Sequence, residues 1–95
     1  DICISHGGGG FSFLAEKMTK LAKLTDPDFD YMGMVKNLWF DTHIEGHRAK
    51  SLLYEFADNQ RIVFGTNFGG FDTPEIIHPD AATLSVNAKK LLRLL

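Results

Sequence analysis

The sequence has a single cysteine, no excess of basic charge and no long apolar run. One cysteine cannot form a disulfide within the chain, so we expect a reducing, cytoplasmic setting and a thiol that is buried in its apolar surroundings. Ten Lys and Arg against twelve Asp and Glu give a formal net charge of -2, without the basic patch that binds nucleic acid. We expect neither a signal peptide nor a membrane span. Nucleic acids and membranes are therefore not expected as partners.

The chain contains three short apolar segments. They are residues 2–5 (ICIS), 38–40 (LWF) and 61–64 (RIVF), and each stops at a glycine-rich or polar segment. Short apolar or aromatic runs with such endings are typical of buried strands. We therefore expect three strands at these positions.

Helical periodicity follows each of these strands. Leu14, Met18 and Leu21 recur at the spacing of a helix, which predicts a first helix whose apolar stripe lies on the sheet. Asp26, which precedes a proline, predicts the start of a short second helix. Two further helical stripes are formed by Ala49, Leu52, Leu53, Phe56 and Ala57, and by Leu84, Ala88, Leu91, Leu92 and Leu95.

The alternation of strands and helices predicts an α/β fold with a parallel sheet, because parallel strands need crossover connections. Three units do not close a barrel, and open parallel edges pair with other strands. We therefore expect residues 1–95 to be a single segment, without an internal domain boundary, of a larger (β/α)8 barrel. The remainder of the barrel and a second copy of the chain are the expected partners. A small self-sufficient α/β domain is the alternative.

Polar residues end all three predicted strands: His6, Asp41 with His43, and Asn67. In α/β barrels the loops after the strands build the active site. Backbone N–H groups in the glycine run beside His6, such as those of Gly7 and Gly8, suit an anion or carboxylate. A flexible turn with a histidine bonded to backbone explains the run equally well. Asp41 is either a substrate contact or the cap of the helix that follows.

Four motifs carry a resemblance to a known family. They are HGGG at residues 6–9, FDT at 40–42, RIVFGTNF at 61–68 and NAKKLL at 87–92. In this order they resemble the C-terminal part of amidohydrolase-related proteins. The nearest branch is that of aminocarboxymuconate-semialdehyde decarboxylase and related metal-dependent decarboxylases. The resemblance implies strands six to eight of the barrel, in a carboxy-lyase or hydrolase of a small carboxylated substrate.

The resemblance also implies roles for individual residues. His6 would polarise or protonate the substrate, beside a divalent metal such as zinc in the full-length protein. Asn67 stands where the family has an aspartate that binds the metal, and an amide is a weak metal ligand and no base. The family's other ligands, a His-x-His pair on strand one and a histidine on strand five, lie outside these residues. The chain alone is then expected to be inactive, and a barrel relic without metal is the alternative.

The HGGG motif also supplies oxyanion-hole amides in lipase and esterase α/β-hydrolases. Those enzymes need a nucleophilic serine in a G-x-S-x-G turn. The nearest candidate, residues 65–69, has Asn67 at the place of the nucleophile. A hydrolase of this kind would therefore be inactive.

Two further polar positions interrupt the apolar pattern. His43 and His47 are four apart and could share a helical face as zinc ligands do, although surface histidines near a helix start are the favoured interpretation. Asn87 interrupts the last helical stripe, which predicts a buried amide that ties down a backbone segment such as the loop after the third strand.

Overall fold

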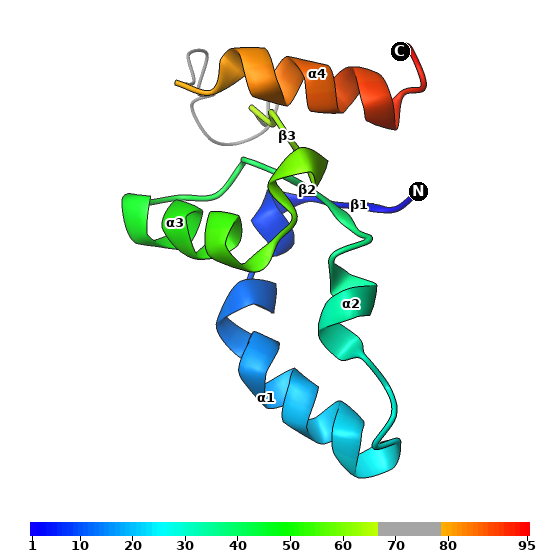
Figure 1. Ribbon diagram of the computed structural model, residues 1–95. Coiled ribbons are helices and arrows are strands. Elements are labelled where there is room, and N and C mark those ends of the chain that lie inside the picture. The colour runs from blue at the N-terminus through cyan, green and yellow to red at the C-terminus, as the bar shows by residue number, and fades with distance from the viewer. Residues whose placement is uncertain (67–78) are drawn as a thin grey trace.

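The fold is a three-stranded parallel sheet with helices packed around it (Figure 1). The computed structural model describes residues 1–66 and 79–95. The sheet has the order β1-β2-β3. Its strands are β1 (Cys3–Ile4), β2 (Trp39–Asp41) and β3 (Ile62–Val63), and the helices are α1 (Phe11–Thr25), α2 (Tyr31–Val35), α3 (His47–Phe56) and α4 (Ala81–Leu91), with 3-10 turns η1 (His6–Gly8) and η2 (Asn59–Arg61). The predicted α/β class, the parallel sheet and the strand-then-helix order are confirmed.

The register of the strands assigns their side chains to two faces. Ile4 lies opposite Phe40, and Phe40 lies opposite Ile62. Since successive side chains alternate across a sheet, these three residues share one face, while Trp39 and Asp41 belong to the other. The face of Phe40 is the one that meets the hydrophobic core.

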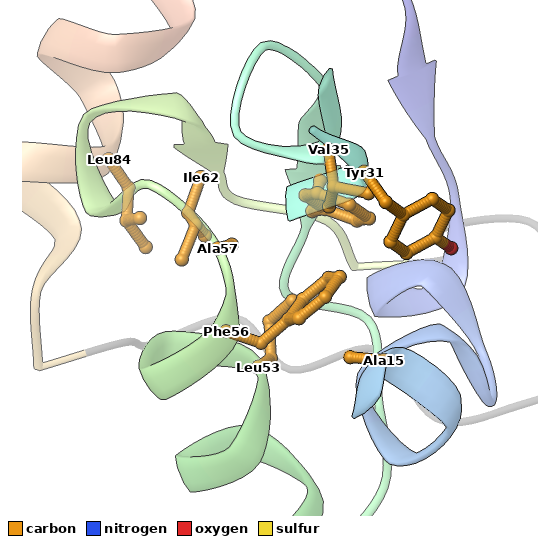
Figure 2. Packing of buried hydrophobic residues seen from close by; sticks show 9 residues of the cluster. Ala15, Tyr31, Val35, Leu53, Phe56, Ala57, Ile62 and Leu84 are labelled. Atoms are coloured by element: carbon orange, nitrogen blue, oxygen red, sulfur yellow. The ribbon is translucent and has the colours of Figure 1, made fainter. Parts of the chain in front are cut away.

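The core contains buried residues from α1, α2, α3 and α4 together with Phe40 and Ile62 of the sheet. Figure 2 shows how Ala15, Tyr31 and Phe56 face one another within it. Phe40 has no exposed surface. Its ring meets that of Phe56 from α3 edge-on at 5.8 Å between centroids, and that of Phe11 at 6.3 Å. Such tilted aromatic pairs stabilise a core beyond the area that they bury. Aromatic contacts with α1 and α3 therefore hold the central strand from one face.

The stripe predicted for the third helix meets this core. The stripe predicted for the fourth helix is only partly correct, because Leu92 and Leu95 follow the end of α4 and are 65% and 75% exposed. Leu53 and Phe56 of α3 are buried, and so is Leu84 of α4. Asn87 is 2% exposed, and its Nδ2 donates to the carbonyl oxygens of Asn59 at 2.9 Å and Ile62 at 2.8 Å. The predicted role of Asn87 is thus confirmed. The segment that it ties down is the entry into β3, and not the loop after it.

The prediction that the apolar stripe of the first helix lies on the sheet is wrong. Leu14, Met18 and Leu21 remain between 39% and 45% exposed. The residues of α1 that are buried are Ser12 and Ala15. Their small side chains let the helix come close to α2 and α3, which it contacts, while it runs away from the sheet (Figure 1). The larger apolar residues therefore lie to one side of this contact.

Two further predictions near the N-terminal half are corrected. The N-cap of α2 is Asp30, whose side chain accepts from the Gly33 N–H at 2.9 Å. Asp26 instead ends α1 and accepts from the Asp28 N–H in a local turn. Cys3 is exposed and not buried, because β1 pairs with a strand on one side only. Within residues 1–66 and 79–95, no helix is both long and apolar enough to cross a membrane.

Candidate functional site at the strand ends

The loops that follow the three strands meet at one edge of the sheet. Parallel strands direct their carboxyl ends to the same edge, where sites in α/β proteins are built. His6 and Gly7 follow β1, Asp41 ends β2, and Gly65 follows β3. The structure therefore brings together four of the residues that lie at or beside the predicted strand ends.

Asp41 joins the first two loops. Its Oδ1 atom accepts a hydrogen bond from the Gly7 N–H at 3.0 Å and another from the His43 N–H at 3.0 Å. Asp41 does not cap the following helix, because α3 begins at His47 with Gly46 as its N-cap. Of the two roles predicted for Asp41, the capping role is wrong. The substrate contact stays a prediction.

Thr42 and Gly65 join the second and third loops. Thr42 is 1% exposed, and its Oγ1 accepts from the Gly65 N–H at 3.2 Å. A Cβ on Gly65 would lie only 2.9 Å from the Cβ of Asp41. Glycine is thus required at this position for the close approach of the loops. Within the FDT motif, Asp41 thus contacts the loop after β1 and Thr42 contacts the loop after β3.

His6 has a strained backbone with a φ of 55°. The left-handed conformation costs a non-glycine residue about 1 to 2 kcal/mol. A hydrogen bond to a charged group contributes about 1.5 to 3 kcal/mol. The bond from the Gly7 N–H to Asp41 is therefore of the size needed to hold the His6–Gly7 peptide in place. Strain of this kind, held by its surroundings, is characteristic of functional sites.

His43, which the sequence places with Asp41 at the end of the second strand, is the second histidine of the site. Its ring lies 4.9 Å from the ring of His6 between centroids, with 59° between their planes. His6 is exposed and His43 is half-buried. His47 lies at the first turn of α3, whereas His43 precedes the helix, so the two do not share a helical face.

The amides of Gly7, Gly8 and Gly9 have partners within the protein. The Gly7 N–H donates to Asp41, the Gly8 N–H to the Ser5 carbonyl at 3.0 Å, and the Gly9 N–H to the His6 carbonyl at 2.8 Å. A ligand that used the predicted amides of Gly7 and Gly8 would have to displace these bonds. The imidazole of His6 is the more accessible group.

The carboxylate of Asp41 also acts on Cys3. Partial burial raises the pKa of the Cys3 thiol, and the negative charge of Asp41 raises this pKa further. Both effects disfavour the thiolate. Cys3 is therefore held as a neutral thiol on the side of the sheet where Asp41 lies.

The described residues do not form a metal centre by themselves. Among residues 1–66 and 79–95, no three side chains of His, Cys, Asp or Glu gather as an ion would require. His6 and His43 supply two imidazoles, whereas protein zinc sites use three or four ligands. Asn67, at the position of the family's aspartate ligand, lies outside the described residues, as do the residues completing the G-x-S-x-G-like turn.

No family model matches the chain, and no curated protein matches its sequence. The resemblance to amidohydrolase-related proteins therefore rests on the four motifs, and it stays a prediction.

Proposed function

We propose that residues 1–95 are the last three β/α units of an amidohydrolase-type (β/α)8 barrel that acts on a small carboxylated molecule. The order of parallel strands and helices supports this proposal. The single observation that carries it is the strained His6, held at the carboxyl edge of the sheet beside Asp41 and His43. In a barrel enzyme the proton donor would lie at this edge of the sheet, which is where His6 lies.

In the proposed reaction His6 acts as the general acid. In decarboxylation the bond between the substrate carbon and its carboxylate breaks, and CO₂ leaves without the bonding electrons. The electron pair stays on carbon and takes the proton of the His6 imidazolium, forming a C–H bond. His6 is then neutral and regains a proton from water. Histidine is the side chain that most often transfers protons in enzymes.

The resemblance implies a divalent metal such as zinc in the complete protein. The described residues offer two imidazoles and do not complete its coordination. Its ligands would then come from other parts of the barrel. Hydrolysis of a related substrate at the same edge is the second form of the proposal, with His6 again as the proton donor.

The test is CO₂ release by the protein expressed from its complete gene, with zinc or manganese supplied. Small unsaturated and aromatic carboxylic acids serve as substrates, and hydrolysis of their amides is measured in parallel. We expect turnover, and we expect His6→Asn to lower it about 100-fold or more, the usual contribution of a general acid. His47→Asn, at an exposed position of α3, is the matched control and should retain activity. No turnover in either assay, or full activity of His6→Asn, would overturn the proposal in favour of a barrel without catalysis.

A further inference from the structure

A single carboxylate oxygen holds the backbone beside both histidines of the site. The Oδ1 atom of Asp41 accepts from the Gly7 N–H, which belongs to the peptide group directly after His6. It also accepts from the N–H of His43 itself. The first bond spans 34 positions of sequence and the second spans two. One atom thus fixes a local turn and a contact between two distant loops.

The two imidazoles belong to separate segments of the chain. His6 lies in the loop after β1, and His43 lies between β2 and α3. Their centroids are nevertheless only 4.9 Å apart. The φ of 55° at His6 turns the backbone away from the conformation that a histidine prefers. A contact that fixes the adjoining peptide groups also fixes the directions in which the two side chains leave the backbone.

We propose that Asp41 is a positioning residue that sets the spacing of the His6 and His43 rings. An ionised carboxylate oxygen has two lone pairs, and the two N–H groups use both on Oδ1. The other oxygen lies under the loop after β3, where a Cβ on Gly65 would be 3.2 Å from Oδ2. Asp41 therefore acts on a substrate through the two rings. This inference rests on the proposed function for what the rings act on, but the positioning is measured without substrate.

The test compares, by NMR, three variants of the protein expressed from its complete gene. Asp41→Asn keeps an oxygen at the position of Oδ1, so both hydrogen bonds should persist. Asp41→Ser has a shorter side chain, which can keep the local turn to the His43 N–H, as serine does in place of Asp, but should not reach Gly7. The control is Asp26→Ser, because Asp26 accepts from the Asp28 N–H at 3.0 Å in the same kind of turn, far from the site.

The readout is the nuclear Overhauser cross-peak between the ring protons of His6 and His43. We expect this cross-peak in the unchanged chain, in Asp41→Asn and in Asp26→Ser, and its loss in Asp41→Ser. A merely structural role of Asp41 would lower the stability of the fold while leaving the cross-peak in place for the folded molecules. Retention of the cross-peak in Asp41→Ser, or its loss in Asp41→Asn, would contradict the proposal.

A second variant covers the case in which Asp41→Ser does not fold. Asp41→Glu keeps the charge but moves both oxygens outward by one methylene, so the rings should separate and the cross-peak should be lost. An unchanged cross-peak in Asp41→Glu would overturn the inference. Absence of CO₂ release in the activity assay, by contrast, would remove the proposed function and leave the positioning of the rings intact.

Discussion

The ring of Phe40 meets the ring of Phe56 edge-on, 5.8 Å away, and so joins the central strand β2 to helix α3. This contact lies on the face of the sheet opposite to Asp41, one residue further along the same strand. The packing of the core and the geometry of the strand-end site are thus connected through two adjacent residues.

Truncation of Phe40 should therefore unfold most of the molecule. Phe40→Ala removes a fully buried ring from the centre of the core, and we expect a loss of about 3 to 5 kcal/mol in the free energy of unfolding. Urea denaturation followed by the fluorescence of the buried Trp39 measures it. Phe13→Ala, at a position 81% exposed, is the matched control and should change the free energy by less than about 0.5 kcal/mol. Equal effects of the two changes would show that the core is assigned wrongly.

Loss of the Asn87 amide should weaken the attachment of α4. Asn87→Ala leaves the carbonyls of Asn59 and Ile62 without their buried donor, which should cost about 2 to 3 kcal/mol. Asn37 also donates through Nδ2, to the Gly33 carbonyl at 3.3 Å, but at an exposed position. Asn37→Ala should therefore cost only about 0.5 kcal/mol. Thermal unfolding by circular dichroism compares the two, and a larger effect at Asn37 would contradict the account.

A side chain at Gly8 should disturb both the glycine loop and the core. Gly8 has a φ of 78°, and a Cβ there would lie 2.9 Å from the Phe40 ring. Gly8→Ala should thus destabilise the fold by about 2 kcal/mol or more, from backbone strain together with the steric conflict. Gly10 has a φ of -80° and open space around it, so Gly10→Ala should be neutral or stabilise by up to about 1 kcal/mol. Equal melting temperatures for the two variants would refute this description of the loop.

The reactivity of Cys3 should report on the charge of Asp41. Because burial and Asp41 both raise the pKa of the thiol, alkylation of the folded chain should accelerate at higher pH than alkylation of the urea-unfolded chain. Asp41→Asn removes the negative charge that raises the pKa of Cys3. The pH midpoint for alkylation of the folded chain should therefore move downward. A midpoint in the folded chain at or below that of the unfolded chain would contradict the assignment.

The raised pKa of Cys3 also predicts how the free energy of unfolding depends on pH. The pKa of Cys3 is raised in the folded state, so the unfolded chain loses its thiol proton first as the pH rises. The contribution of the Cys3 thiol to the free energy of unfolding is complete below its unfolded-state pKa. It is lost as the pH rises through its folded-state pKa. Cys3→Ser should flatten this alkaline part of the stability profile, which urea titrations at several pH values measure.

The sequence predicted the elements better than their contacts. Trp39–Asp41 lies within one residue of the predicted strand, because a short apolar and aromatic run has few alternatives. Periodicity also placed Leu53 and Leu84 in the core. It failed for α1, where Ala15 packs and Leu14 is left partly exposed. Which side of a helix is buried depends on its neighbours, and a pattern within one segment does not contain them.

The meeting of the strand-end loops at one edge of the sheet was predictable, whereas the bonds between these loops were not. His6 and Asp41 were selected because both end predicted strands. The bond from the Gly7 N–H to Asp41 joins residues 34 positions apart, and such a contact depends on the register between β1 and β2. His43 was considered with Asp41 at the end of the second strand, whereas its contact with His6 was not predicted. Its proximity to His6 arises from the meeting of two loops.

The central claim, that these residues form the active-site end of a larger barrel enzyme, is tested most directly by native mass spectrometry of the protein from its natural source. This one measurement gives the mass of the chain and of any bound ion. The account predicts a chain well above 10.6 kDa that carries zinc or another divalent metal. A 10.6 kDa chain without metal would contradict it, and the catalytic role of His6 would then have to be abandoned.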